Sequence, residues 1–357
     1  MGGLTAPAPA LPSRRHAVVR TIAQSWRRLT TDARSAHNSS GEPTLIACSG
    51  GGDSSALVLA LAAAAGRHAP GLLTVVHVLH DLRPMAQVRA DRDRAAELAR
   101  VLGLPFAERA VAVKALPGNA EANARRARYT ALAEVARSRN VRFIATAHNS
   151  HDQAESVLMA LLRGAGPRGL AGIAESRKLP GGSSERGGRL TLIRPMLGVT
   201  PSDARTLCAD CDWSFAHDRT NDDPTRLRNA IRAEILPGLL ALRPSAATRI
   251  ASAAQRCMEA ADAVSRSARA QLARGRNGGN FNWPRPQLRR ATPAVLGETL
   301  RRAAAALAGP EMSDRLPART ITAAVRLIRS HDTDPKTLRW SRVRVSIDAH
   351  TVRITAG

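Results

Sequence analysis

A glycine-rich stretch, residues 45–55, carries the residue types suited to holding a phosphate. It reads Leu-Ile-Ala-Cys-Ser-Gly-Gly-Gly-Asp-Ser-Ser, and an unbroken run of Ala, Leu and Val follows over residues 56–65. This pattern predicts a buried strand, a tight loop and a helix. Glycines let the backbone approach a ligand closely, and a helix N-terminus offers unpaired N–H groups and a positive dipole end. The ligand expected here is therefore an anion, most simply a phosphate.

A second candidate site is a pair of carboxylates, Asp152 and Glu155, at the start of a predicted helix. Residues three apart lie on one helix face, and a helix N-terminus stabilises carboxylates. The pair is suited to a negative pocket for an ammonium group, with one carboxylate able to take its proton. Two carboxylates that only cap the helix are an equally good interpretation of the spacing alone.

Alternating strands and helices must position these residues. Buried strands are predicted at residues 44–48, 72–79, 106–113 and 141–147, with helices at 56–66, 86–102, 119–139 and 152–162. Such alternation predicts an α/β fold with a mostly parallel sheet covered on both faces. The glycine-rich loop and residues 77–83 and 148–152 all follow strand ends. They should converge on one cleft beyond the carboxyl edge of the sheet.

Other segments flank this sheet. Val18, Ile22, Trp26 and Leu29 form one apolar face of a basic helix, which packs beside the core or serves as a lid. The remaining expectations are a basic loop at 163–169 bordering the cleft, a Gly/Ser-rich surface loop at 180–188, a strand at 190–194 and a helix at 201–212.

The pattern changes after about residue 236. Helices are predicted at 246–272, 293–308 and 319–330, a loop or short extended segment at 275–286, and a closing hairpin at 343–354 with its turn at 348–350. The expected organisation is a flexible tail at 1–15, a domain at 16–235 that contains the glycine-rich loop and the carboxylate pair, and a smaller domain at 236–357. The last is mainly helical and ends in a β-hairpin.

Composition points to a polyanionic partner. The 357 residues include 53 Lys+Arg against 29 Asp+Glu, a net charge of +24, which favours nucleic acid. Four cysteines fit a reducing compartment, and Cys208 and Cys211 are interpreted as two thiols on one helix. No apolar run is long enough to span a membrane, so we expect a cytoplasmic protein without a membrane partner. The sequence leaves the oligomeric state open, a homodimer included.

The glycine-rich loop lacks the Lys of a Walker motif and the spacing of a Rossmann fingerprint. Ser49-Gly50-Gly51-Gly52-Asp53-Ser54 instead resembles the PP-loop of ATP pyrophosphatases, which cut ATP between its α- and β-phosphates. In order along the chain, further motifs closely resemble those of the tRNA(Ile)-lysidine synthase family. They are His77-Val78-Leu79-His80-Asp81-Leu82-Arg83, Asn119 through Arg128-Tyr129, Asp152-Gln153-Ala154-Glu155, Arg163 through Leu170, Ile193-Arg194-Pro195, Asp218 through Asn221, and Arg228-Asn229-Ala230-Ile231-Arg232.

The resemblance implies an adenine nucleotide alpha hydrolase-like fold and a ligase that forms a carbon–nitrogen bond. It implies that residues 16–235 are the ATP-binding catalytic domain and that residues 236–357 recognise the tRNA. ATP and Mg²⁺ would adenylate the C2 oxygen of the first anticodon cytidine of tRNA(Ile) with anticodon CAU, and the side-chain amine of free L-lysine would then attack C2. It implies that residues 49–54 bind ATP, that Asp53 and Asp152 are catalytic with Asp53 a candidate magnesium ligand, and that Asp152 and Glu155 seat the lysine. The further residues that it implies as contacts to ATP or tRNA are His77, Arg125, Arg128, His148, Arg228 and Arg232. For Arg125 and Arg128, a solvated helix face is the alternative.

Two positions depart from the family pattern. His151 stands where the family has the first Asp of a pair, and Asp81 replaces the Gly after His80. Because Asp tolerates the left-handed region, we expect that turn to survive. His151 keeps open a catalytically silent tRNA-binding homologue. A PP-loop tRNA thiolase is the other alternative, although such an enzyme needs cysteines near the cleft.

Overall fold

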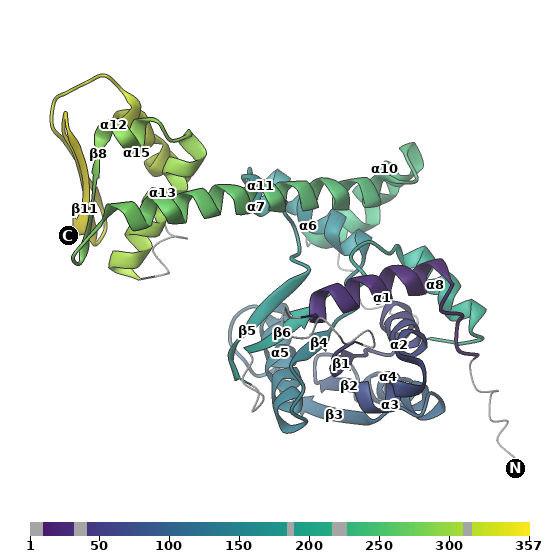
Figure 1. Cartoon of the computed structure of the whole chain (residues 1–357). Coiled ribbons are helices and arrows are strands. Elements are labelled where there is room, and N and C mark those ends of the chain that lie inside the picture. The colour runs from purple at the N-terminus through teal and green to yellow at the C-terminus, as the bar shows by residue number, and fades with distance from the viewer. Residues whose placement is uncertain (1–9, 32–40, 184–188, 216–226, 310–315) are drawn as a thin grey trace, which may run out of the picture. The chain divides into compact units, whose positions relative to one another are not determined.

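The computed structural model describes residues 10–31, 41–183, 189–215, 227–309 and 316–357 (Figure 1). The chain forms two compact units, Met1–Gln255 and Arg256–Gly357. The boundary expected from the sequence, between residues 235 and 236, falls inside the first unit. The domain limits proposed from the sequence stay a prediction.

The first unit contains a six-stranded sheet in the order β3-β2-β1-β4-β6-β5. Its strands are β1 Thr44–Ala47, β2 Leu73–His80, β3 Phe106–Val111, β4 Phe143–Ala145, β5 Ser176–Ser183 and β6 Arg189–Ile193. All neighbouring pairs are parallel except β5 with β6. The predicted α/β class with a mostly parallel sheet is therefore confirmed.

The antiparallel strand β5 was not predicted. Its Pro-Gly-Gly sequence is typical of a turn, and the sequence-based interpretation made residues 180–188 a surface loop. The structure instead extends β5 to Ser183 beside β6, with a register shift between Lys178 and Ser183. An edge strand tolerates Pro and Gly because one of its sides needs no ladder hydrogen bonds. Residues 184–188 lie outside the described ranges.

Helices cover both faces of this sheet, as Figure 1 shows. They are α1 Ala17–Thr30, α2 Gly52–Ala65, η1 Gly66–His68, α3 Ala69–Leu72, α4 Met85–Val101, α5 Ala120–Ser138, α6 Ser150–Leu162, α7 Pro167–Leu170, α8 Pro201–Asp210, α9 Leu227–Ala230, the π-helical turn η2 Ile231–Ile235, and α10 Leu236–Leu242. One hydrophobic core joins the sheet to α1, α2, α4 and α8, and a second joins its other face to α5. The short basic segment expected as a loop at 163–169 contains the start of α7.

Helix α1 packs against the core, as one of its two expected roles required. Its buried face includes Val19, Ile22 and Trp26. The indole Nε1 of Trp26 donates to Thr44 Oγ1 at 2.8 Å, which fixes the helix to the start of β1. No helix within the described ranges combines the length and apolar character that a membrane crossing requires.

The second unit is richer in strands than the sequence indicated. The predicted hairpin is confirmed as β10 Val343–Ile347 and β11 Thr351–Ala356, paired antiparallel. They belong to a five-stranded sheet in the order β7-β8-β11-β10-β9. The other elements are the end of α11 Ala246–Gly275, β7 Arg276–Asn277, β8 Asn280–Pro284, α12 Arg285–Arg289, α13 Pro293–Ala308, α15 Ala318–Arg329 and β9 Lys336–Trp340. Strand β8 lies where a loop or extended segment was expected.

A buried arginine, Arg285, connects several elements of the second unit through hydrogen bonds. The Arg285 side chain is only 3% exposed and donates to the carbonyls of Leu327, Ile328, Ser330, Asp332 and Asp348 at 2.6–3.2 Å. Three of these carbonyls lie at the C-terminal end of α15, where a cation is favoured and carbonyls lack helical partners. The guanidinium thus links α15 to the β10–β11 turn.

Replacing Arg285 by Lys should lower the free energy of unfolding of this unit by about 3 kcal/mol. Lysine has too few donors for these carbonyls, and each buried group left unpaired costs about 1–3 kcal/mol. Hydrogen–deuterium exchange of the β10 and β11 amides in the full chain measures the effect. Arg289→Lys is the matched control, because its half-buried side chain is hydrogen-bonded, among the described residues, to the His331 ring at 3.1 Å and to no backbone carbonyl. Equal loss of protection in both variants would contradict the assignment.

Candidate active site

The glycine-rich loop connects β1 to α2 and has a conformation that only glycine suits at its centre. Gly50 has φ of +86°, and a Cβ there would lie 2.5 Å from the carbonyl oxygen of Asp91. Gly51 is the N-cap of α2, so no side chain covers the N–H groups of the first turn. This leaves the loop and the helix N-terminus able to bind an anion, as predicted.

The two loop serines contact each other. Ser54 Oγ accepts from Ser49 N at 3.1 Å, lies 3.1 Å from Ser49 Oγ and donates to Gly51 O at 2.9 Å. These bonds close the loop on itself and fix its shape. Ser49 is exposed and Ser54 is buried, so Ser49 is the hydroxyl that a ligand can reach.

Asp53 occupies the first turn of α2 and faces the second candidate site. Its Oδ2 accepts from Asn149 Nδ2 at 2.9 Å. Burial and the negative charge of Asp152 raise the pKa of Asp53 to about 6, while Asn149, Arg205 and Arg232 partly oppose that rise. The two carboxylates predicted as catalytic therefore lie close enough to influence each other.

Asn149 joins the two predicted sites. It is the N-cap of α6, where its side chain accepts from the N–H groups of His151 and Asp152, and its own N–H donates to Asp152 Oδ2 at 3.0 Å. This is a capping box, which fixes the side chains of the first turn. The same buried residue also donates to Asp53. Asn149 was not among the predicted site residues, although an Asn directly before a helical run is a recognisable N-cap signal.

Asp152 and Glu155 are paired with the two arginines of the later motif. Arg228 Nε donates to Glu155 Oε2 at 2.8 Å and its Nη2 to Asp152 Oδ1 at 3.0 Å. Arg232 Nε donates to Glu155 Oε1 at 2.6 Å. Glu155 is fully buried, whereas 18% of the Asp152 side chain is exposed. The structure thus brings together four predicted site residues.

The pairing gives Arg228 and Arg232 partners that the sequence analysis did not foresee. They had been assigned to ATP phosphates or tRNA, and such contacts stay a prediction. Arg232 lies in the π-helical turn η2, a type of distortion often found at functional sites.

A basic wall lies beside this cluster. Arg125 and Arg128 project from α5, Arg194 follows β6, and Arg228 belongs to α9. Together with burial, their charges lower the pKa of His148 to about 3. His148 is therefore neutral at physiological pH. Arg194 is buried and Arg228 is paired with the carboxylates, so Arg125 and Arg128 are the two of these arginines that a phosphate group can reach. Arg125 and Arg128 are exposed, so a solvated helix face also fits them.

His77 has a different environment from the one expected. It is buried, and its Nδ1 donates to the Cys48 carbonyl at 2.9 Å, which ties β2 to the start of the glycine-rich loop. Burial lowers its pKa. A direct contact to ATP or tRNA stays a prediction, and the contact seen is a structural one.

The fold accommodates Asp81 and His151, the two residues that depart from the family pattern. Asp81 Oδ1 accepts from the N–H groups of Val113 and Lys114 at 2.8 and 3.0 Å, and its φ is not in the left-handed region. His151 is half-buried at the start of α6, and burial lowers its pKa. Residues 218–221, part of another motif, lie outside the described ranges.

The cysteines lie behind the loop. Cys208 is on α8 and Cys211 is its C-cap, as the interpretation of two thiols on one helix required. Cys208 Sγ donates to Gly52 O at 3.5 Å. Burial raises the pKa values of Cys208 and Cys211 to about 12 and about 11.

Residues 21–239 match the family model described as "PP-loop domain". The chain is 42% identical over 217 residues to a tRNA(Ile)-lysidine synthase of Salinispora tropica, covering 60% of this chain and 61% of that protein. It is 40% identical over 236 residues to a tRNA(Ile)-lysidine synthase of Bordetella pertussis, covering 64% of this chain and 69% of that protein. The chain belongs to the PP-loop family, in its tRNA(Ile)-lysidine synthase branch.

The predicted resemblance is thereby confirmed. PP-loop membership also implies that the chain uses ATP. Among solved structures, a U34-tRNA thiolase NcsA from Methanococcus maripaludis with its [4Fe-4S] cluster superimposes with a TM-score of 0.51 and 16% identity, covering 69% of this chain and 81% of that chain. At that identity the likeness concerns the fold. The chain spans about three fifths of the length of the Salinispora relative.

Proposed function

We propose that this PP-loop protein is a tRNA(Ile)-lysidine synthase. It would use ATP to adenylate the C2 oxygen of the cytidine at the first anticodon position of tRNA(Ile) with anticodon CAU, releasing pyrophosphate. The side-chain amine of free L-lysine would then attack C2, forming a carbon–nitrogen bond and releasing AMP. A cytoplasmic location suits such an enzyme.

One observation carries the proposal. Asn149 connects the anion-binding loop to the carboxylate pair, by donating to Asp53 and capping the helix that bears Asp152 and Glu155. The loop proposed to hold the leaving pyrophosphate and the carboxylates proposed to hold the ammonium group are therefore linked through one buried residue. Fixed positioning of two reacting groups is a major source of rate enhancement.

The residues present fit a magnesium ion. Mg²⁺ usually takes one or two carboxylates together with substrate phosphates. Asp53 is the carboxylate that would hold it, because burial and the charge of Asp152 raise its pKa, which a bound cation would oppose. Within the described ranges no three His, Cys, Asp or Glu side chains are grouped to hold a metal. Held by Asp53, the ion would offset negative charge on the nucleotide phosphates.

The carboxylate pair supplies the lysine chemistry. An amine with a pKa of about 10.4 is protonated at neutral pH and must lose a proton before it attacks. Asp152 is the accessible member and is our candidate base, while Glu155 lies beneath it. Because Arg228 and Arg232 already neutralise both carboxylates, the incoming ammonium must share or replace those ion pairs.

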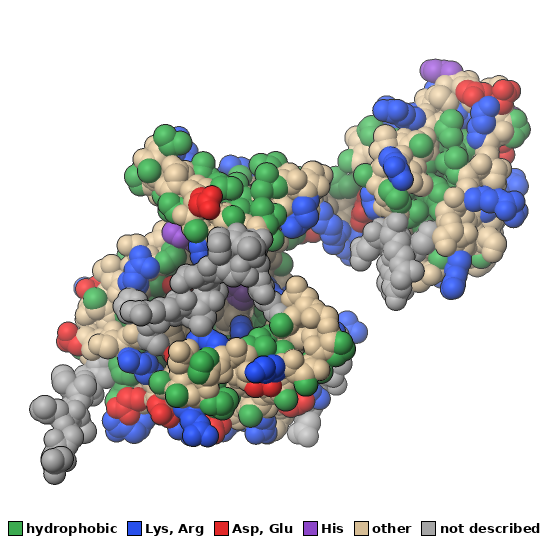
Figure 2. Space-filling model, turned by 180° about the vertical axis from the view of Figure 1, so that it is seen from behind, with side chains coloured by type: hydrophobic (Ala, Val, Ile, Leu, Met, Phe, Trp, Pro, Cys, Tyr) green, Lys and Arg blue, Asp and Glu red, His purple; other side chains and the backbone are tan. Residues whose placement is uncertain are grey.

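The basic surface supports an RNA partner. Figure 2 shows Lys and Arg side chains spread over the visible face, with interspersed acidic groups. With a net charge of +24, the chain can neutralise many phosphates. Arg125 and Arg128 are exposed beside the site and are proposed to contact the anticodon phosphates or ATP.

A thiolase is less consistent with the cysteines. Thiolates are the reactive form of cysteine, and burial raises the pKa values of Cys208 and Cys211 well above neutrality. A silent tRNA binder rests on His151, which stands beside an otherwise complete carboxylate pair.

The test is incorporation of labelled lysine into a tRNA(Ile) transcript with anticodon CAU, with ATP and magnesium. We expect incorporation by the native chain and a loss of at least about 100-fold in Asp152→Asn, the typical size of a general-base contribution. Asp203→Asn, an exposed cap on α8, should leave the rate unchanged. Native protein that binds ATP and tRNA without incorporating lysine would favour the silent-binder alternative.

A further inference from the structure

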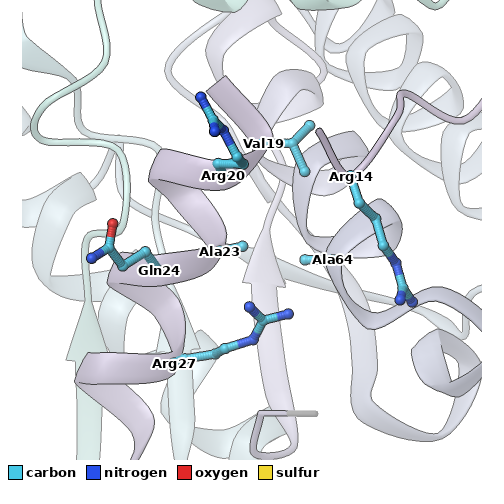
Figure 3. A pocket seen from close by; sticks show the side chains of 7 residues that line it. All are labelled: Arg14, Val19, Arg20, Ala23, Gln24, Arg27 and Ala64. Atoms are coloured by element: carbon cyan, nitrogen blue, oxygen red, sulfur yellow. The ribbon is translucent and has the colours of Figure 1, made fainter. Parts of the chain in front are cut away.

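A hollow of about 470 Å³ lies between α1 and α2, away from the candidate active site (Figure 3). Ala23 and Ala64 face each other across its floor, and Arg27 reaches from α1 toward the middle. The lining is completed by Arg14, Val19, Arg20 and Gln24. The space exists because small side chains meet where the two helices pack.

The arginines are held on a rigid frame. Helix α1 is fixed by its buried apolar face and by the Trp26–Thr44 hydrogen bond. Arg14, just before α1, is anchored because its Nε donates to the Ala63 carbonyl at 2.9 Å. A side chain at Gly66, where φ is +57°, would run into the Arg14 guanidinium. Glycine at this position therefore leaves room for the arginine.

The guanidiniums of the hollow are available to a ligand. Helix α1 contains no Asp or Glu. Arg28, on another side of the helix, forms a two-pronged pair with Glu175 at 2.7 and 2.8 Å. Arg20 and Arg27 have no carboxylate partner among the described residues. Guanidinium groups bind phosphate oxygens with two parallel hydrogen bonds, so a phosphate is the group that best fits this hollow.

The position of the hollow indicates an extended ligand. The phosphate-binding loop is at the N-terminus of α2 and Ala64 is near its C-terminus. At about 1.5 Å per residue, the two sites are roughly 18 Å apart along the helix. A nucleotide in the loop cannot span that distance, whereas a folded RNA can contact both.

We propose that Arg14, Arg20 and Arg27 form a second phosphate-binding surface, which holds the backbone of the RNA substrate away from the reacting base. This inference rests on the proposed function for its partner. It assigns the N-terminal basic helix a role in RNA affinity and none in the chemistry.

The experiment measures binding of a labelled tRNA(Ile) transcript to the full chain by fluorescence anisotropy, without ATP or lysine, from about 50 to about 200 mM salt. The variant is Arg20→Gln/Arg27→Gln. The matched control is Arg28→Gln/Arg100→Gln, which removes the same charge from guanidiniums already paired with Glu175 and Glu97. Arg20→Lys/Arg27→Lys keeps the charge, and thermal unfolding checks that all variants are folded.

Each lost phosphate contact should reduce the slope of log affinity against log salt by about 0.7–0.9, so the test variant should lose about 1.4–1.8. The matched control should keep the native slope, and the Lys variant should recover most of it. An unchanged slope in the test variant, with native binding intact, would overturn this surface alone. No RNA binding by the native chain would overturn the proposed function as well. If inorganic pyrophosphate binding falls in the test variant while the RNA slope does not, the hollow takes a free phosphate compound and the RNA assignment is wrong.

Discussion

Replacing Glu155 by Gln is expected to lower the free energy of unfolding by about 2–3 kcal/mol and to abolish lysine transfer. The Glu155 carboxylate is fully buried and accepts hydrogen bonds from Arg228 at 2.8 Å and from Arg232 at 2.6 and 3.0 Å. Removing one partner of a buried ion pair costs about 3–5 kcal/mol, and the partial exposure of the two guanidiniums reduces that figure. The neutral amide would leave two cations facing one remaining carboxylate, Asp152.

Urea denaturation at neutral pH measures the loss, with Glu175→Gln as the matched control. Glu175 also forms a two-pronged pair, but with the exposed Arg28. Exposed ion pairs contribute about 0–1 kcal/mol, so the control should change little. If the two variants lost equal stability, the four-residue cluster would have no special structural role.

The Glu155→Gln variant also distinguishes a structural role of the four-residue cluster from a role in lysine binding. Were Glu155 needed only to hold Arg228 and Arg232, the folded variant would still bind lysine through Asp152. We expect it to lose lysine binding and keep ATP binding, because the phosphate-binding loop does not contact Glu155 in the described structure. Isothermal titration with each ligand distinguishes these outcomes.

Elements with strong periodicity could be predicted from sequence alone. The glycine-rich loop, its flanking strand and helix, and a mostly parallel sheet all follow from local patterns, and the structure confirms them. Strand β5 was missed because Pro and Gly normally interrupt strands, and only its edge position tolerates them. Strand β9 in the second unit was missed because its hydrophobic alternation is short and carries Lys336 and Arg339.

Several residues of the candidate site could be predicted from the sequence, but the hydrogen bonds and ion pairs between them could not. The spacing of Asp152 and Glu155 placed them on one face of a helix. Their arginine partners lie 73–80 positions further along the chain, and local sequence cannot reveal a contact over such a separation. The link from Asn149 to Asp53 spans 96 positions and was invisible for the same reason. These contacts form only through tertiary packing. They determine that Arg228 and Arg232 neutralise the carboxylates of Asp152 and Glu155.

Asp53→Asn should make the ligand-free protein more stable at neutral pH. The ordinary pKa of this carboxyl is 3.8, and in the folded chain it is raised to about 6. Between these values the folded state binds a proton that the unfolded state does not, so stability falls as pH rises. Above about pH 6 the ionised carboxylate costs about 2–3 kcal/mol, at about 1.4 kcal/mol per pKa unit. Asparagine removes this cost and keeps an oxygen that can accept from Asn149.

Thermal unfolding measured across pH tests whether Asp53 destabilises the ligand-free protein at neutral pH, as its raised pKa predicts. The melting temperature of Asp53→Asn should exceed that of the native chain by several degrees above about pH 7, and the difference should shrink as pH falls from about 6 to about 4. Asp203→Asn is the opposing control, because Asp203 accepts from the Thr200 backbone and hydroxyl in a capping box and its loss should destabilise. If the difference in melting temperature between Asp53→Asn and the native chain widened toward low pH, the raised pKa of Asp53 would be contradicted.

A buried carboxylate that weakens the fold needs a reason to be present. We expect Asp53→Asn to lose magnesium-dependent ATP–pyrophosphate exchange by at least about 100-fold, the size typical for removing one group that stabilises charge in a transition state. Stability and activity would then change in opposite directions in one variant, which is the pattern expected of a residue that serves the reaction at the expense of the fold. A variant that is stabilised yet fully active would remove Asp53 from the nucleotide site.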